Sequence, residues 1–269
     1  MIDFRNRAVC LGNSPLFLRL ADHYALVPSA VLIRTAEAEL LRSAPIDPPA
    51  LDLCCGDGFF ASLIRPQGFE AGCDINESAL LAAAERNIYG SLAYADVTRE
   101  IPFPDAHFNT VVSNSSLEHV DDIHKALREI TRVLRPGGRL YTTLGSNFAY
   151  EWWPCGQEAL KRYLEYQPVY NHFSLEEWEE CMARVGLRIV SHQYYLSKPA
   201  TRLLMFLDYH YSHVSMTADR TPARPIIRTM RRVPGRARSL LWQTLFAPIK
   251  ILSQGSGGGI LIIAERPET

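Results

Sequence analysis

The stretch LDLCCGDG, residues 51–58, decides the predicted fold, because an apolar run ends there in two closely spaced glycines. The apolar residues 50–55 predict a buried strand, and residues 59–67 predict the helix that follows it. Gly56 and Gly58 remove side chains at a turn where the backbone could approach a bound molecule closely. The turn is a candidate seat for a nucleotide-type cofactor, although such turns also use glycine for packing alone.

Short apolar runs alternate with helix-like patterns on either side of this turn, between residues 48 and 143. The further predicted strands are 69–75, 91–97, 107–114 and 139–144, and the predicted helices are 77–87 and 122–134. Asn76 is the predicted N-cap of the first helix, and Arg135-Pro136-Gly137-Gly138 is predicted to end the second. This alternation is typical of βαβ units and predicts an α/β fold with a parallel sheet.

Two mainly helical segments flank or interrupt this pattern. Residues 1–45 are expected to form a helical cap over the cofactor side of the sheet. Its expected packing residues are Leu16, Leu18, Leu20, Val31, Leu32, Leu40 and Leu41. A helix is predicted at 173–187 and strands at 188–196 and 257–267, which leaves 199–256 as a helical insertion between two strands.

Acidic or small polar residues stand at the ends of successive predicted strands. Asp74 closes the second strand, 22 residues after Asp52, where a carboxylate can accept hydrogen bonds from both hydroxyls of a ribose. Asp96 follows the third strand and could accept from an adenine amino group. Ser113 and Asn114 end the fourth strand, under the reactive part of a cofactor lying across the sheet. An isolated aspartate at a strand end is usually a solvated turn residue. The prediction of a cofactor site therefore rests on the succession of such residues at neighbouring strand ends.

The chain resembles the class I S-adenosylmethionine-dependent methyltransferases of the type 11 family. The matching segments are 51–58, 72–76, 95–120, 127–143 and 173–190. The resemblance implies a Rossmann-like, seven-stranded, mostly parallel sheet whose last strand is antiparallel. It also implies a methyltransferase domain at 46–198 and 257–269, with 199–256 as a lid over the substrate. Its cofactor would be S-adenosylmethionine, its product S-adenosylhomocysteine, and no metal is expected.

The same resemblance assigns roles to individual residues. Asp52, Gly56 and Gly58 would contact the methionine part of the cofactor, Asp74 the ribose, Asp96 with Val97 the adenine, and Ser113 the sulfonium side. Cys54, Ile75 and Asn114 complete the expected cofactor site. The family usually has glycine where this chain has Cys54, and a cysteine is accommodated there if its φ angle is negative.

The sulfonium of S-adenosylmethionine already activates the methyl group, so the main task of the protein is to hold the acceptor atom, the methyl group and the sulfur in line. A base is optional and would help a hydroxyl, phenol or acidic carbon to react. Glu118 and His119, after the fourth strand, and His172, before the helix at 173–187, are the candidate catalytic residues. The Glu118–His119 segment is not catalytic in every member of the family that it resembles, and a histidine placed before a helix, as His172 is, often only caps or packs.

Composition narrows the class of protein. A chain of 269 residues with 47% hydrophobic residues can bury a substantial core, and a net charge of −1 argues against a nucleic-acid-binding surface over the whole molecule. Six cysteines without a CxxC pair predict reduced thiols in a cytosolic protein. No signal peptide is expected, and the longest apolar stretch, 240–252, is too short and polar to span a bilayer. The expected location is the cytoplasm.

Two insertions are expected to choose the acceptor. Residues 147–171 contain seven aromatic side chains, and Tyr150, Trp152 and Trp153, with Tyr24 of the cap, are candidate substrate contacts. The segment 199–256 joins apolar helices to a basic centre, with eight cations and one acid from residue 219 to residue 250. It could hold a lipid-like acceptor with an anionic head or rest on a membrane surface.

The preferred reading is O- or C-methylation of a small lipophilic molecule by in-line displacement. A nucleic-acid methyltransferase is the first alternative, but the chain has no RNA-binding module and no Asn-Pro-Pro-aromatic tetrad. A dehydrogenase is disfavoured because Ala61 stands where a third glycine would complete GxGxxG. A non-catalytic cofactor-binding partner protein stays open, as does the oligomeric state.

Replacing Asp74 with alanine tests the predicted ribose contact. Asp74→Ala should weaken S-adenosylmethionine binding by about 1.5–3 kcal/mol, the usual contribution of hydrogen bonds to a charged group. Isothermal titration calorimetry measures the dissociation constant, and circular dichroism confirms the fold. An unchanged constant in a folded variant would remove Asp74 from this role.

Overall fold

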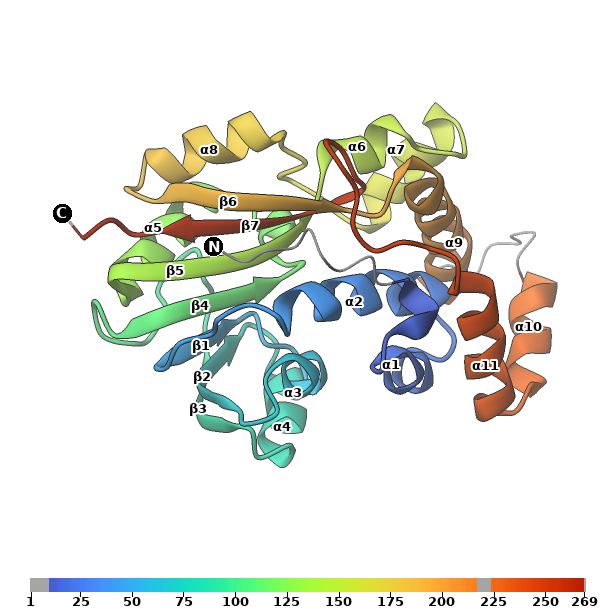
Figure 1. Ribbon diagram of the computed structural model, residues 1–269, viewed down its shortest axis with the longest axis horizontal. Helices are drawn as coiled ribbons and strands as arrows, with labels where there is room; N and C mark the ends of the chain where they lie inside the picture. Colours follow the sequence, from blue (N-terminus) through green and yellow to red (C-terminus); the bar gives the residue numbers. More distant parts are fainter. Residues whose placement is uncertain (1–9, 217–223, 269) are drawn as a thin grey trace.

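Seven strands form a single mixed sheet in the computed structural model, which describes residues 10–216 and 224–268 (Figure 1). The strands are β1 Ala50–Leu53, β2 Phe69–Asp74, β3 Tyr89–Tyr94, β4 Phe108–Asn114, β5 Leu134–Gly145, β6 Arg188–Tyr195 and β7 Gly259–Glu265. Their order is β3-β2-β1-β4-β5-β7-β6, and only β7 runs antiparallel to its neighbours. The predicted α/β sheet with an antiparallel last strand is confirmed.

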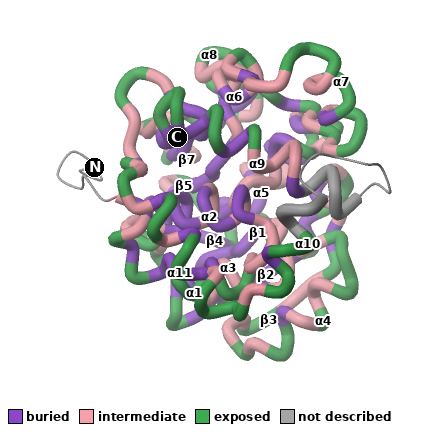
Figure 2. Tube along the Cα trace, turned by 90° about the vertical axis from the view of Figure 1, so that its right-hand side faces the viewer, coloured by how far each residue is buried: buried purple, intermediate pink, exposed green. Residues whose placement is uncertain are grey.

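Helices cover both faces of this sheet. They are α1 Phe17–His23, α2 Pro28–Leu41, α3 Phe59–Ile64, α4 Glu77–Glu85, α5 Ile123–Val133, α6 Asn147–Glu151, α7 Gln157–Tyr166, α8 Leu175–Ala183, α9 Lys198–Met216, α10 Arg224–Arg232 and α11 Gly235–Phe246, with short 3₁₀ turns at Leu11–Asn13 and Leu117–His119. Alternate residues of β7 join two separate apolar clusters, one with α5 and α8 and the other with α2, α3, α9 and α11. Figure 2 shows the buried residues concentrated along the strands and α2.

The N-terminal helices pack on the later insertion as well as on the sheet, since α2 contacts α9 and α3 while α1 contacts α11. Phe17, Leu20 and Ala21 are fully buried on one side of α1. Leu18 is 41% exposed, so its predicted packing role is wrong. With 3.6 residues per turn, position 18 is turned about 100° around α1 from Phe17 and lies outside the arc of its buried neighbours.

Several predicted boundaries shift. Helix α3 ends at Ile64, and β3 begins at residue 89 and ends at 94. The segment Arg135-Pro136-Gly137-Gly138 lies within β5, which starts at Leu134 directly after α5. Leu134 pairs with Phe108 and Arg139 with Thr110, so the pairing register shifts between them and the additional residues bulge from the strand. The turn signal in this segment therefore marks an irregularity inside a strand.

Other features agree with the sequence. Asn76 caps α4 by accepting a hydrogen bond from the Ala79 amide, and Ser174 and Glu177 form a reciprocal capping box at the start of α8. All six cysteines are free thiols. No helix within the described ranges has the length and hydrophobicity needed to cross a membrane.

Candidate functional site

The turn between β1 and α3 is held in a left-handed conformation at three positions. The φ angles are +57° at Cys54, +55° at Gly56 and +71° at Gly58. The condition of a negative φ at Cys54 is therefore wrong, and a cysteine in this region is strained by about 1–2 kcal/mol. A Cβ atom on Gly58 would also lie 2.9 Å from the ring of Tyr89, so conformation and space both call for glycine there.

Asp74 joins this turn to the next strand. Its Oδ2 atom accepts a hydrogen bond of 2.8 Å from the Gly56 amide, and its Oδ1 atom accepts one of 2.8 Å from the Asn76 amide. A Cβ atom on Gly56 would meet nothing within 4 Å, so the space beside the turn is open. The turn thus offers a carboxylate with spare lone pairs next to uncovered backbone.

Asp52 lies beneath the turn and is buried. Burial raises the pKa of its carboxyl group to about 7, and the nearby charge of Asp74 adds to the increase. The hydroxyl of Tyr89 donates a 2.6 Å hydrogen bond to Asp52 Oδ2 and opposes the shift. Tyr89 was missed by sequence reasoning, since nothing in the local pattern of β3 marks it as the partner of an aspartate 37 positions earlier.

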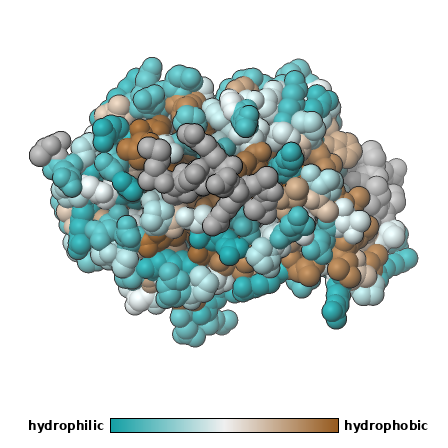
Figure 3. Space-filling model, in the orientation of Figure 1, coloured by the Kyte–Doolittle hydropathy of each residue, from teal (hydrophilic) through white to brown (hydrophobic). Residues whose placement is uncertain are grey.

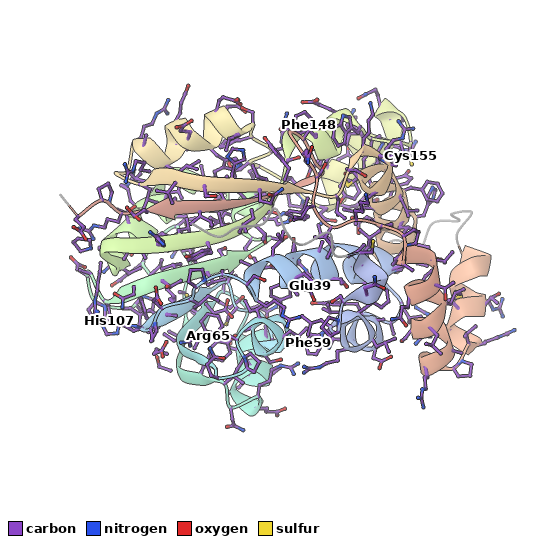
Figure 4. All side chains as sticks on the ribbon, viewed as in Figure 1. Glu39, Phe59, Arg65, His107, Phe148 and Cys155 are labelled. Carbon is purple, nitrogen blue, oxygen red and sulfur yellow. The ribbon has the colours of Figure 1, made fainter. Side chains whose placement is uncertain are left out.

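Asp57 ties the glycine turn to two other helices. Its carboxylate lies 2.9 Å from Arg86 Nη2 and 3.7 Å from His23 Nε2. The His23 ring stacks on Phe59 with centroids 3.7 Å apart. Phe59, at the start of α3, is labelled in Figure 4. Tyr24, a predicted substrate contact, packs edge-on against both rings and lines neither of the cavities described next.

The first cavity, here called the strand-end cavity, has a volume of about 410 Å³ and opens at the ends of β2 and β3. Its walls are Cys54, Asp74, Ile75, Ala95, Asp96, Val97, Thr98, Ser116, His119, Val120, Asp121 and Tyr170. Five predicted cofactor residues meet there: Cys54, Asp74, Ile75, Asp96 and Val97. Asp96 accepts hydrogen bonds from the Thr98 hydroxyl at 2.7 Å and amide at 3.0 Å, which keep the pKa of its carboxyl group low.

The other predicted cofactor residues are absent from the lining of this cavity. Ser113 is fully buried in β4, and its hydroxyl has no hydrogen-bond partner. The side-chain oxygen of Asn114 accepts a 2.9 Å hydrogen bond from the Thr143 hydroxyl. Neither residue lines the strand-end cavity, and neither do Asp52, Gly56 and Gly58, although the Gly56 amide donates a hydrogen bond to Asp74 of its wall.

The second cavity, here called the α9 cavity, has a volume of about 230 Å³ and shares His119 with the first. Its walls are Ser29, Ala30, Ile33, Arg34, Ser115, Glu118, His119, Gly145, Ala149, Tyr150, Tyr163, Gln167, Val169, Leu204, Met205, Asp208 and Gly258. These residues come from α2, the loop after β4, the aromatic insertion and α9. The predicted helical cap and the predicted lid thus meet at one cavity.

Glu118 is the most unusual group in this wall. Only 5% of its surface is exposed, its Oε1 atom accepts a 3.2 Å hydrogen bond from the Gly145 amide, and Oε2 has no partner. Burial raises the pKa of its carboxyl group. The backbone carbonyl of Glu118 accepts hydrogen bonds from the amides of Tyr170 and Asn171, at 2.9 and 3.1 Å. A buried carboxylate with a free oxygen is thus fixed against a cavity.

A second buried carboxylate, Glu37, contacts two residues that line the α9 cavity, Arg34 and Ser115. It pairs with Arg34 through a contact of 2.6 Å. It also accepts hydrogen bonds from the Ser115 hydroxyl at 2.5 Å and the Tyr195 hydroxyl at 3.0 Å. Sequence reasoning missed this network, although Arg34 and Glu37, three positions apart in a mostly apolar helix, were a usable signal.

Asp208 connects three helices around the same cavity. It accepts a 2.6 Å hydrogen bond from the Tyr163 hydroxyl of α7 and a 2.8 Å hydrogen bond from the Ser29 hydroxyl of α2. The helix α9 is therefore fastened to both neighbours at the wall of the cavity.

The remaining predicted residues divide between wall and packing. Tyr150 lines the α9 cavity, whereas Trp152 stacks on Phe148 and Trp153 is buried against Tyr163. His172 is exposed, with its ring 5.5 Å from that of Tyr150, and lines neither cavity. Within the described ranges, no three histidine, cysteine, aspartate or glutamate side chains are grouped to bind a metal ion.

Comparison with known proteins gives a match of residues 51–142 to the family described as methyltransferase domain. A demethylmenaquinone methyltransferase from Listeria monocytogenes is 32% identical over 138 residues, which are 48% of this chain and 57% of that protein. The ubiquinone/menaquinone biosynthesis C-methyltransferase UbiE of Yersinia enterocolitica is 39% identical over 99 residues, which are 34% of this chain and 39% of that one. The match thus spans little more than half the length of the Listeria relative and less than half that of the Yersinia relative.

A solved structure extends the similarity to most of the chain. An S-adenosylmethionine-dependent methyltransferase from Thermotoga maritima has a TM-score of 0.58 at 17% identity, over 93% of this chain and 98% of that one. At this identity the match shows the fold alone. The sheet has the Rossmann-like arrangement of the class I methyltransferases.

Removing the hydroxyl of Tyr89 tests the electrostatic account of Asp52. Tyr89→Phe deletes a hydrogen bond that favours the ionised carboxylate, so the pKa of Asp52 should rise above its starting value of about 7. Carbon NMR of protein labelled at the aspartate carboxyl groups follows the titration, with Asp52→Asn assigning the signal. Tyr94→Phe, at an exposed tyrosine of the same strand, is the matched control. An unmoved midpoint in Tyr89→Phe would contradict the account.

Proposed function

We propose that the chain is an S-adenosylmethionine-dependent methyltransferase that methylates a small, lipophilic acceptor on oxygen or carbon, and the match of residues 51–142 to the methyltransferase domain family supports this proposal. The observation that carries the proposal is the pair of cavities with His119 in their common wall. One cavity carries carboxylates in the order expected for an adenosine, and the other carries a buried carboxylate with a free oxygen. A methyl donor and its acceptor would lie side by side there.

The strand-end cavity suits S-adenosylmethionine in size and chemistry. Asp74 keeps lone pairs for ribose hydroxyls, and Asp96 and Val97, which line the same cavity, are proposed to contact the adenine. Ile75, 58% exposed in the same lining, would add an apolar contact. The open backbone at Gly56 and the Asp52 carboxylate suit the charged methionine end. When bound, S-adenosylmethionine supplies an activated methyl group.

The α9 cavity is proposed to hold the reacting head of the acceptor. At about 230 Å³ it is smaller than most ligand pockets, which favours a compact ring or hydroxyl-bearing head. Leu204 and Met205 of α9, with Ile33 and Val169, offer apolar contacts for a hydrophobic extension. The names of the Listeria and Yersinia relatives refer to quinone biosynthesis, which supports an acceptor of this kind.

Glu118 is proposed as the base. Its free Oε2 atom can accept a hydrogen bond from an acceptor hydroxyl or an acidic C–H group and take the proton as the new bond forms. The raised pKa of the Glu118 carboxyl group lies nearer to the pKa of the acceptor group from which it would take the proton. His119, whose Nδ1 atom lies 2.8 Å from the Pro168 carbonyl oxygen, is held between the cavities and would orient the acceptor.

The walls of the α9 cavity support a division of the chain into domains. We propose that 46–198 and 257–269 form the methyltransferase domain, that 1–45 is a cap, and that 199–256 is a lid whose helix α9 closes the acceptor cavity. Asp219 and Arg220, counted in the basic centre of the lid, lie outside the described residues.

Methyl transfer itself is tested with S-adenosylmethionine labelled with tritium in the methyl group. The protein should label a hydrophobic small molecule in an organic extract of cells. Label in RNA would favour the nucleic-acid alternative. Calorimetric binding of S-adenosylmethionine without transfer to the lipid, small-molecule or RNA fraction would favour a non-catalytic protein.

Replacing Glu118 tests the proposed base once an acceptor is known. Glu118→Gln keeps the shape of the side chain and removes the proton acceptor, so kcat should fall by about 10²–10⁴-fold. The KM for S-adenosylmethionine should stay unchanged, because Glu118 lines only the α9 cavity. Initial rates across pH should rise in the wild type through a pKa above the ordinary glutamate value and lose that limb in the variant. Glu85→Gln, at an exposed site on α4, is the control, and a full rate in Glu118→Gln would exclude the base.

A further inference from the structure

The helices α10 and α11 form the right-hand end of the molecule in Figure 1 and carry a distinctive surface. Trp242 and Phe246 are buried on one side of α11. On its other side Leu240, Leu241 and Leu245 are 48%, 42% and 54% exposed. Figure 3 shows apolar atoms over α11 at this end of the molecule. Three leucines exposed together on one helix are unusual for a surface that faces only water.

Arginines accompany these leucines. Arg228, Arg231 and Arg232 are exposed on α10, and positions three and four apart lie on one side of a helix. Arg236 is exposed at the start of α11. The Arg238 guanidinium donates a 2.9 Å hydrogen bond to the Met230 carbonyl oxygen and so fastens the two helices together. Figure 2 looks onto this end and shows exposed segments in both helices.

Charge is strongly segregated along the chain. Residues 224–264 contain seven arginines and lysines and no aspartate or glutamate, a net charge of +7. Since the whole chain has a net charge of −1, the rest of it carries −8. A negatively charged surface therefore attracts this end of the molecule and repels the remainder, which orients the protein.

We propose that α10 and α11 dock the protein on an anionic lipid bilayer, with Leu240, Leu241 and Leu245 entering the interface and the arginines pairing with lipid headgroups. The combination of apolar insertion and basic attraction is what interfacial helices use, and it complements a bilayer better than it complements a single anionic molecule. Helix α9 precedes α10 in the chain, exposes Leu203 and Phe206, and turns Leu204 and Met205 toward the acceptor cavity. Docking at this end would place the proposed lid against the lipid bilayer, in which a lipophilic acceptor is dissolved.

Vesicle co-sedimentation tests the docking directly, and it needs no methyl transfer, so its outcome is independent of the proposed function. The full chain should sediment with vesicles of equal parts phosphatidylglycerol and phosphatidylcholine, and far less with phosphatidylcholine alone. Added salt should weaken the binding, because exposed charges are screened. Equal binding to both vesicle types, or to neither, would overturn the proposal.

Paired variants identify the docking residues. Arg231→Gln with Arg232→Gln should lower the partition coefficient by about fivefold for each charge removed. Leu241→Asn with Leu245→Asn should lower it on the order of tenfold. Arg184→Gln on the opposite side of the sheet and Leu81→Asn, 73% exposed on α4, are the matched controls and should bind as the wild type does. Thermal unfolding confirms that each variant is folded. If a double variant does not fold, the single variant Arg231→Gln replaces it in the test.

Two other occupants of this surface are distinguished in the same variants. Sedimentation equilibrium detects a second copy of the chain, and fluorescence anisotropy with a single-stranded RNA detects a nucleic acid. If the leucine variants dissociate a dimer, or the arginine variants abolish RNA binding, while vesicle binding is unchanged, the bilayer proposal is overturned.

Discussion

The hydrogen bond from the Gly56 amide to Asp74 fixes the geometry on which the rest of the site depends. Strands β1 and β2 are parallel neighbours, with Leu53 opposite Cys73, so their carboxyl ends open at the same edge of the sheet. The 2.8 Å bond closes the first turn onto the end of the second strand. The other oxygen of Asp74 holds the Asn76 amide, so one carboxylate sets the start of two strand-to-helix connections. Asp74 itself lines the strand-end cavity, so the group that orders both connections also faces the space proposed for the cofactor.

The sequence predicts the strands and the carboxylates of the strand-end cavity well, because local sequence patterns determine them. Alternating apolar runs identify each strand, and parallel pairing brings Asp74 and Asp96 to one edge whatever else the chain does. The left-handed backbone at Cys54 was not predicted, since a cysteine gives no local sign of it. The Cys55 amide, which donates a 3.0 Å hydrogen bond to the Cys73 carbonyl, shows that pairing with the neighbouring strand holds the turn in place. Tertiary contacts thus overrule a residue preference.

The surroundings of the α9 cavity were predicted only in part, because the contacts there join segments that are distant in the sequence. Glu118 could be proposed from its place after the fourth strand, and Tyr150 from the density of aromatic residues in the insertion at 147–171. The bond between Ser115 and Glu37 spans 78 positions, and the bond between Ser29 and Asp208 spans 179. No periodicity or motif records such pairs. They become visible only when the cap, the aromatic insertion and α9 have packed around one space, where buried polar groups must find partners.

The two amides of Tyr170 and Asn171 that hold the Glu118 backbone carbonyl have a consequence for how this protein could diversify. These residues end the aromatic insertion, so the segment that lines the α9 cavity also supports the carboxylate facing it. Exchange of the insertion between related chains would displace that carboxylate at the same time. New acceptor ranges would then arise more readily by substitution inside the insertion than by recombination of whole loops, and the segment would be inherited as a single unit with Glu118.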